Sequence, residues 1–263
     1  MLDDIAAFNK DRWEELSREG VQFGIPWLDL TPAEALRRID PEGVPMDAKG
    51  RDVLCLAASG GQQSAAFGLL GARVTVFDIS ETQLEKDRLA AAHYRLELRT
   101  VQGDMRDLSC FAPDSFDVVW LAHGINFVPD ARAVIGESAR VLRHGGLFRM
   151  ECTNPFVHGI WDSWNGDGYL LKSPYVDGGE VAYADPYWTF SAGGTDRRVQ
   201  GPREFRHSFS TIMNAVIGNR LRVLGLWEKG IGDASAPPGS WRHFEAHAPP
   251  WISFWARSEK QGA

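Results

Sequence analysis

The first half of the chain alternates between short apolar runs and stretches with helical spacing. The apolar runs that predict strands lie at residues 52–57, 73–78, 97–101, 116–121 and 147–151. Between these runs, helical spacing predicts helices at about 62–70, from Ser80 to about His93, and near 130–142. His144-Gly145-Gly146 predicts a tight turn into the fifth strand. Strands that alternate with helices are joined by right-handed crossovers and form a parallel sheet. The pattern therefore predicts a doubly wound α/β core over residues 51–151.

This alternation stops after Glu151 and resumes near residue 207. Residues 152–206 contain four of the five tyrosines among glycines and prolines, with no clear period. Long irregular segments are uncommon in compact domains unless they are functional or disordered, and the aromatic content argues against disorder. We expect this aromatic insertion to form the wall and lid of an acceptor pocket, the alternative being a small satellite core.

The remaining elements complete the sheet and cover one end of it. A helix near 209–218 and strands at 221–227 and 251–256 make a mostly parallel sheet of seven strands, so that residues 207–263 close the core. Residues 1–50 form a helical lead-in, with a first helix that Gly20 ends and a second that Thr31 and Pro32 begin. Trp13 and Trp27 in the lead-in either cover a ligand or fasten the lead-in to the core.

Composition restricts the class of protein. The 263 residues fit one domain with an insertion, and the net charge of -7 argues against a nucleic-acid partner. The one candidate basic cluster consists of Arg197, Arg198, Arg203 and Arg206. The three cysteines (Cys55, Cys110 and Cys152) are isolated and lack the spacing of a metal site. With an acidic start and no long apolar run, we expect a cytoplasmic monomer or homodimer with no metal and no membrane segment.

Three sequence segments indicate an adenosine site. The strand that starts at Val53 runs into a turn of small residues, and the second strand ends at Asp78. An acid at this strand end can accept hydrogen bonds from two ribose hydroxyls. After the third strand, the carboxylate of Asp104 can take an adenine amino group and the thioether of Met105 can pack on the ring.

A nicotinamide-dependent oxidoreductase is the first alternative. Its G-x-G-x-x-G fingerprint places a pyrophosphate at a helix N-terminus. Here the corresponding positions are Ala57, Ser59 and Gln62. S-Adenosylmethionine has no phosphate and does not need this fingerprint.

The chain resembles the class I S-adenosylmethionine-dependent methyltransferases, in particular a bacterial subgroup that acts on small molecules. The matching segments are Val53–Gly61, Val74–Ser80, Gln102–Met105, Ser115–Val119 and Val141–Gly146. The family's turn glycines fall on Ala57, Ser59 and Gly61, and its first-strand acid falls on Cys55. Alanine and serine exclude the positive φ that glycine adopts at little cost.

The resemblance implies a role for each of these residues in cofactor binding. Gly60, Gly61 and Gln62 would face the methionine end of the cofactor, beside Ala57 and Ser59. Asp78 would bind the ribose. Ile79 and Met105 would cover the adenine faces, and Asp104, next to Gly103, would bind its amino group.

Methyl transfer from a sulfonium is an in-line displacement that depends mainly on alignment and exclusion of water. A base is needed only for a poor nucleophile such as a hydroxyl. His123, which follows the fourth strand, is the first candidate base, with His207 and His158 as others. We expect a small-molecule acceptor in a pocket formed by Trp13, Trp27, Asn126, Trp161 and Trp164. A module that binds the cofactor without catalysis is the second alternative.

Overall fold

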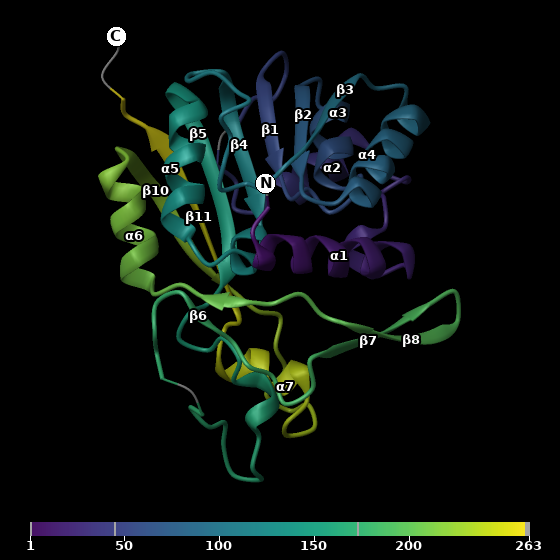
Figure 1. Ribbon diagram of the computed structural model, residues 1–263, viewed down its shortest axis with the longest axis vertical. Helices are drawn as coiled ribbons and strands as arrows, with labels where there is room; N and C mark the ends of the chain where they lie inside the picture. The colour runs from purple at the N-terminus through teal and green to yellow at the C-terminus, as the bar shows by residue number, and fades with distance from the viewer. Residues whose placement is uncertain (1, 45, 173, 261–263) are drawn as a thin grey trace.

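A computed structural model describes residues 2–44, 46–172 and 174–260 (Figure 1). Its centre is a seven-stranded sheet with the order β10-β11-β5-β4-β1-β2-β3. The strands are β1 (Asp52–Leu56), β2 (Arg73–Asp78), β3 (Leu98–Gln102), β4 (Phe116–Ala122), β5 (Leu142–Thr153), β10 (Leu221–Lys229) and β11 (Trp251–Ser258). Neighbours from β3 to β5 are parallel, whereas β11 runs antiparallel to both β5 and β10. The predicted doubly wound, mostly parallel seven-stranded sheet is confirmed.

Helices cover both faces of this sheet (Figure 1). One face packs on α5 (Ala131–Val141) and α6 (Phe209–Gly218), and the other packs on α2 (Pro32–Ile39), α3 (Gln63–Leu69) and α4 (Glu81–Tyr94). The side chain of Ser80 accepts a hydrogen bond from the backbone of Gln83, and Thr31 forms a capping box with Glu34. These caps satisfy N–H groups that have no partner within the helix, which is why α4 and α2 begin where the sequence predicts.

The predicted turn before the fifth strand lies inside β5. Phe116 pairs with Leu142, but the next pair along β4 is Val118 with Leu147. Residues 143–146 of β5 are therefore not paired with β4. Gly145 has a φ of 75°, which glycine adopts at little cost. The turn therefore interrupts a longer strand and does not precede it.

The aromatic insertion contains regular structure that its sequence did not predict. It contains η3 (Trp161–Ser163), β6 (Gly179–Glu180), β7 (Tyr187–Ala192), β8 (Thr195–Gln200) and β9 (Phe205–Arg206), and α7 (Trp241–His247) lies near it (Figure 1). β7 and β8 form a hairpin whose two-residue turn is Gly193-Gly194, both with positive φ. Such a glycine pair matches the twist of paired strands, so the expectation of an irregular segment was wrong here.

The lead-in helix α1 (Asp4–Arg18) lies between the sheet and the insertion (Figure 1). Its Leu16 joins Val21 and Val199 of the hairpin in a small buried cluster, with Trp13 and Trp188 against it. The lead-in thus connects the two parts of the chain. In the described ranges, no helix has the length and apolar character needed to cross a membrane.

Candidate active site

A cavity of about 1040 Å³ lies where the carboxyl ends of the sheet strands face α1 and the insertion. Most of the residues predicted for the site line it, namely Ala57, Ser59, Asp78, Ile79, Gly103, Asp104, Met105, Trp13, His123, Asn126 and Trp161. Its described lining does not include Gly60, Gly61, Gln62, Trp27, Trp164 or His207. The structure therefore brings both ends of the predicted site to one cavity.

The turn after β1 adopts a left-handed backbone although two of the three family glycines are replaced by alanine and serine. Ala57 and Ser59 have φ values of 49° and 52°, and Gly60 and Gly61 follow with 55° and 85°. The expectation that alanine and serine exclude positive φ was wrong. Each left-handed non-glycine residue costs about 1–2 kcal/mol, and such strain persists only where the surroundings fix it. Here Ala57 donates a backbone hydrogen bond of 3.0 Å to Phe77, which holds the turn against β2.

Gly61 and Gln62 hold the turn against neighbouring elements. The backbone N–H of Gly61 donates to Asp87 of α4 at 2.7 Å, and a side chain at Gly61 would meet the Lys86 backbone at 2.8 Å. The Gln62 amide donates to the backbone oxygens of Gln22 and Ile25, so it points to the lead-in. Trp27 donates its backbone N–H to Gly61 at 3.2 Å. Gln62 and Trp27 thus fasten the lead-in to the turn.

Asp78 is a buried carboxylate at the cofactor end of the cavity. It accepts a hydrogen bond of 2.8 Å from the backbone of Ser80. Burial raises the pKa of Asp78 to about 7, against the effect of the Ser80 hydrogen bond, and the charge of Glu14 raises it further. Burial also raises the pKa of Asp87 to about 7. A proton therefore competes for the group that is predicted to bind the ribose.

Asp104 is engaged by a cation within the protein. Both of its carboxylate oxygens accept hydrogen bonds from Arg106, whose Nη1 also contacts Asp3 at 2.8 Å. An adenine amino group would share the Asp104 carboxylate with Arg106. Ile79 and Met105 line the cavity beside it.

The chemistry of this end fits S-adenosylmethionine better than a pyrophosphate. Asp78 and Asp104 are acidic, and Arg106 is bound by two carboxylates. Among the described lining residues, this leaves no cation here to receive phosphates, whereas adenosine and a sulfonium need none. In the same ranges, no group of three or more His, Cys, Asp or Glu side chains is arranged to hold a metal ion.

His123 lies beyond β4 and contacts a glutamate through its ring. Its Nε2 is 2.7 Å from Oε1 of Glu151, and its ring packs edge-on against Trp251 with centroids 4.4 Å apart. Its Nδ1 is buried and has no hydrogen-bond partner among the described residues. Burial alone would raise the pKa of Glu151, but His123, Arg149 and Lys229 together hold it well below its usual range. Glu151 therefore stays ionised and holds the His123 ring in place.

Behind this pair is a buried charge network that the sequence did not reveal. Arg149 and Glu42 each have 2% of their side chain exposed and lie 3.2 Å apart, and Lys229 contacts both Glu42 and Glu151. Glu42 also accepts hydrogen bonds from Ser253 and Trp255 at 2.8 and 3.1 Å. Glu42 belongs to the lead-in, so the network joins it to β5, β10 and β11.

The other predicted side chains differ in their placement. The Asn126 amide is bonded at both ends to Thr153, which fixes its orientation at the cavity wall. Nε2 of His207 is 3.0 Å from the Ile125 backbone oxygen, and burial lowers the pKa of this histidine. Trp164 packs on Tyr169 and His243, outside the described lining of the cavity.

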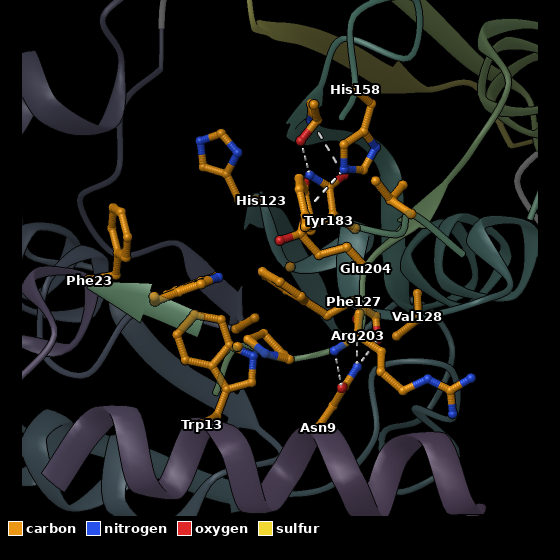
Figure 2. Close-up of a pocket in the computed structure, with 18 of the residues that line it drawn as sticks. Asn9, Trp13, Phe23, His123, Phe127, Val128, His158, Tyr183, Arg203 and Glu204 are labelled. Carbon is orange, nitrogen blue, oxygen red and sulfur yellow. Dashed lines mark hydrogen bonds and ion pairs between the residues drawn. The ribbon is translucent and has the colours of Figure 1, made fainter. Parts of the chain in front are cut away.

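Two groups of hydrogen-bonded polar residues at the acceptor end of the cavity were not predicted from the sequence (Figure 2). Oε2 of Glu204 lies 3.0 Å from Nε2 of His158 and 2.8 Å from the Tyr183 hydroxyl. The buried amide of Asn9 donates to the backbone oxygens of Phe127 and Arg203 at 2.8 and 3.0 Å and accepts from the Arg203 backbone at 2.7 Å. Only the fold brings these positions together, because they lie on segments up to 194 residues apart.

Aromatic side chains form the wall between the two ends. Trp13 packs edge-on against Phe127 and Trp188, with ring centroids 5.1 and 5.7 Å apart, and Phe23 also packs edge-on against Trp188. Figure 2 labels Trp13, Phe23 and Phe127. Trp161, Trp241 and Trp251 also line the cavity. The acceptor end is therefore largely apolar and suits flat ligands.

Comparisons with known proteins agree with this geometry. The model of the methyltransferase domain family matches residues 54–150. An uncharacterized methyltransferase of Bacillus subtilis, YbaJ, is 33% identical over 195 residues, which cover 70% of this chain and 74% of that protein. A ubiquinone biosynthesis O-methyltransferase of Xanthomonas oryzae is 30% identical over 153 residues, 58% of this chain and 60% of that one.

The fold has a similar counterpart among solved structures. An S-adenosylmethionine-dependent methyltransferase from Mesorhizobium loti superimposes with a TM-score of 0.60 at 20% identity, over 88% of this chain and 100% of the other. At this identity the likeness concerns the fold, and it agrees with the strand order described above.

Proposed function

Since the chain belongs to the class I S-adenosylmethionine-dependent methyltransferases, we propose that its methyl acceptor is a small molecule enclosed in the cavity. The observation that carries the proposal is that one cavity is lined both by the predicted adenosine residues, such as Asp78 and Met105, and by the aromatic insertion, such as Trp161. A cavity of about 1040 Å³ has room for a cofactor and a second small ligand. The ubiquinone biosynthesis O-methyltransferase among the relatives supports the same class of acceptor.

The cofactor end would hold S-adenosylmethionine through a small set of contacts. The bound cofactor supplies a methyl group on a positively charged sulfur. The Asp78 carboxylate accepts hydrogen bonds from the ribose hydroxyls, and Ile79 and Met105 cover the adenine. The backbone of the turn at Ala57 and Ser59 faces the methionine part.

His123 is the proposed proton acceptor for an acceptor hydroxyl. The ionised Glu151 at 2.7 Å favours the tautomer with its proton on Nε2 and would stabilise the imidazolium formed when the ring takes a second proton. Because Nδ1 is buried, the ring must shift to present this atom to the acceptor. Asn126, fixed by Thr153, would orient the acceptor. Trp13 and Trp161 would exclude water from it. His207 is engaged with the Ile125 backbone and has no part in the proposal.

The partners and location expected of this enzyme follow from its composition. The net charge of -7 supports the absence of a nucleic-acid partner. In the structure the four arginines of the candidate basic cluster contact protein groups: Arg197 pairs with Glu19, Arg198 with Asp185, Arg203 with Glu180, and Arg206 bonds to backbone oxygens. We expect a cytoplasmic enzyme that is a monomer or homodimer, which light scattering would distinguish.

The test is methyl transfer to an unfractionated metabolite extract. The protein is incubated with S-adenosylmethionine carrying a labelled methyl group, and labelled products are identified by mass spectrometry. We expect label in a compound of low molecular mass and release of S-adenosylhomocysteine. Label found in protein or nucleic acid, or no transfer by a protein that binds the cofactor, would contradict the proposal.

A further inference from the structure

We infer that Glu204, with His158 and Tyr183, forms a subsite that recognises a hydroxyl group of the acceptor, and that the acceptor is an uncharged hydroxylated compound. The inference rests on the proposed function, because it concerns the acceptor end of the same cavity. It assigns a role to Glu204 and Tyr183, which neither the family resemblance nor the sequence pattern singles out, and it gives His158 a role in binding in place of the role of a candidate base.

The cluster has a defined geometry on the cavity wall. Oε2 of Glu204 is shared by Nε2 of His158 at 3.0 Å and by the Tyr183 hydroxyl at 2.8 Å, and all three residues line the cavity. Figure 2 shows the three side chains converging on one another, apart from His123. The side chains of His158 and Glu204 are 3% and 12% exposed, so the cluster is largely shielded from bulk water.

Hydrogen bonds to backbone oxygens hold Glu204 and His158 in this arrangement. Glu204 accepts from the backbone of Val181 at 2.8 Å, next to the short antiparallel pair of β6 and β9. Arg206 of β9 donates from Nη2 to the His158 backbone oxygen at 2.7 Å. Three separate parts of the insertion therefore meet at Glu204. Polar groups held in place by such supporting bonds can select a ligand, because their orientation does not change on binding.

The charges around the cavity favour an uncharged ligand. The two arginines among the described lining residues are each held by carboxylates: Arg106 by Asp104 and Asp3, and Arg203 by Glu180 in a bidentate pair. An acceptor with a carboxylate or phosphate would meet Glu204 without a free cation to offset its charge. A buried charge without a partner is costly, so anionic acceptors are disfavoured.

A hydroxyl complements this cluster better than other neutral groups. It can donate to the Glu204 carboxylate, whereas an ether can only accept. His158 and Tyr183 already donate to Glu204, so the carboxylate does not need a cationic amine as its partner. Around it, Trp161, Trp241 and Phe127 provide apolar walls for the rest of the ligand.

The experiment compares four small aromatic probes that differ in one substituent. The affinities of 4-nitrophenol, 4-nitroanisole, 4-nitroaniline and 4-nitrobenzoate are measured by calorimetry on the full chain with S-adenosylhomocysteine, at a mildly acid pH that keeps the phenol neutral. We expect 4-nitrophenol to bind about tenfold more tightly than 4-nitroanisole, the effect of one hydrogen bond to a charged group. The aniline should bind more weakly than the phenol, and the benzoate most weakly.

Variants assign this preference to the cluster. Glu204→Gln should reduce the phenol preference to about threefold or less, because it removes the charge from the hydrogen bond. Tyr183→Phe should reduce the preference similarly, because the carboxylate loses the hydroxyl that orients it. The matched control is Glu180→Gln, which changes a glutamate of the adjacent β6 strand that lines the same cavity and pairs with Arg203. Its preference should stay at the value of the unmodified protein. Tyr183→Phe removes a single oxygen, so it provides the test if Glu204→Gln does not fold.

The inference is overturned if 4-nitroanisole binds as tightly as 4-nitrophenol, if the aniline or the benzoate binds best, if no probe binds, or if the preference survives in both variants. The affinity for S-adenosylhomocysteine separates this failure from a failure of the proposed function. If the cofactor product binds and the phenol preference is absent, only the hydroxyl subsite is wrong. If the cofactor product does not bind at about pH 8 either, where the Asp78 carboxylate is ionised, the proposed function itself fails.

Discussion

Asp78 connects cofactor affinity to pH at the scale of a single residue. Burial raises its pKa to about 7, and the ionised form accepts hydrogen bonds from ribose hydroxyls more strongly, and through both oxygens, than the protonated form does. Because the folded protein holds this proton more tightly than the unfolded chain, Asp78 contributes stability below about pH 4 that is lost as pH rises through about 7. Cofactor binding, in contrast, favours the ionised form of Asp78. The affinity for S-adenosylhomocysteine should therefore increase from about pH 6 to 8, with proton release on binding.

Replacement of Asp78 tests this assignment. Asp78→Asn should weaken binding of S-adenosylhomocysteine by about 1.5–3 kcal/mol and make it nearly independent of pH over the same interval. Asp52→Asn is the control, because Asp52 pairs with Arg73 at the amino end of β1, away from the cavity. Calorimetry in two buffers of different ionisation enthalpy gives both affinity and proton release. An unchanged affinity in Asp78→Asn would mean that Asp78 only holds the turn before α4, through the Ser80 backbone.

The placement of Asp78, Ile79 and Met105 on one cavity was predictable, because the ends of neighbouring parallel strands meet at one edge of the sheet. Asp78, as the last residue of β2, stays at that edge whatever conformation the loops adopt. Gln62 differs, since its amide donates to the backbone oxygens of Gln22 and Ile25, 40 and 37 residues earlier in the chain. Glu204 was not predictable, because its partners His158 and Tyr183 come together only through the pairing of β6 with β9.

At the scale of elements, Asn9 holds α1 on the cavity. Asn9→Ala would leave two backbone oxygens and one N–H buried without their partners, at Phe127 and Arg203. Each such group costs about 1–3 kcal/mol, so we expect a loss of at least 2 kcal/mol in the free energy of unfolding. Urea denaturation measures it. Asp11→Ala, at an exposed position of the same helix, should change stability by less than about 0.5 kcal/mol.

The hydrophobic period and the helix caps predicted the helices and strands of the core, but they did not predict those of the insertion. Ser80 and Thr31 mark helix starts that the structure reproduces, because caps act within four residues. The β7–β8 hairpin was missed although Gly193-Gly194 is a hairpin signal, since its strands bury only Val199 and have no continuous apolar face. The position of the hairpin depends on α1, which contacts it through Leu16 and Trp13. The sequence of the hairpin alone does not predict this contact.

At the scale of the whole molecule, Glu42 joins the lead-in to the far strands. Burial by itself would raise its pKa, but Arg149 and Lys229 lower it to about 2. The resulting stability is present above the ordinary value of 4.5 and is lost as pH falls through about 2. Glu42→Gln leaves Arg149 with Glu151 as its remaining carboxylate partner, so we expect a loss of roughly 1.5–3 kcal/mol near neutral pH, as for a hydrogen bond to a charged group. Thermal unfolding from neutral pH to about pH 3 should also lose much of its acid dependence, and an unchanged acid profile would contradict this role.

The two ends of the hairpin lie close together, because the backbone N–H of Gly201 donates to the backbone oxygen of Pro186 at 2.8 Å. A short turn can therefore join them. Replacing residues 187–200 with a short Gly-Ser turn should abolish methyl transfer by opening the cavity wall at Trp188. Affinity for S-adenosylhomocysteine should fall less than tenfold, since Asp78 and Met105 remain. Hydrogen exchange in the unmodified protein should slow in the hairpin when ligands bind. Full activity of the shortened protein would assign the hairpin to a satellite core.

The single cavity shared by the two ends has a consequence for inhibition. A compound that joins an adenosine to an uncharged hydroxylated ring would occupy both ends at once, with its linker passing His123. Binding of the second half would then be intramolecular, and the affinity should exceed that of either fragment by roughly a hundredfold or more. Selectivity would come from the ring, because the adenosine site belongs to the family as a whole whereas Glu204 and its partners belong to the insertion of this chain.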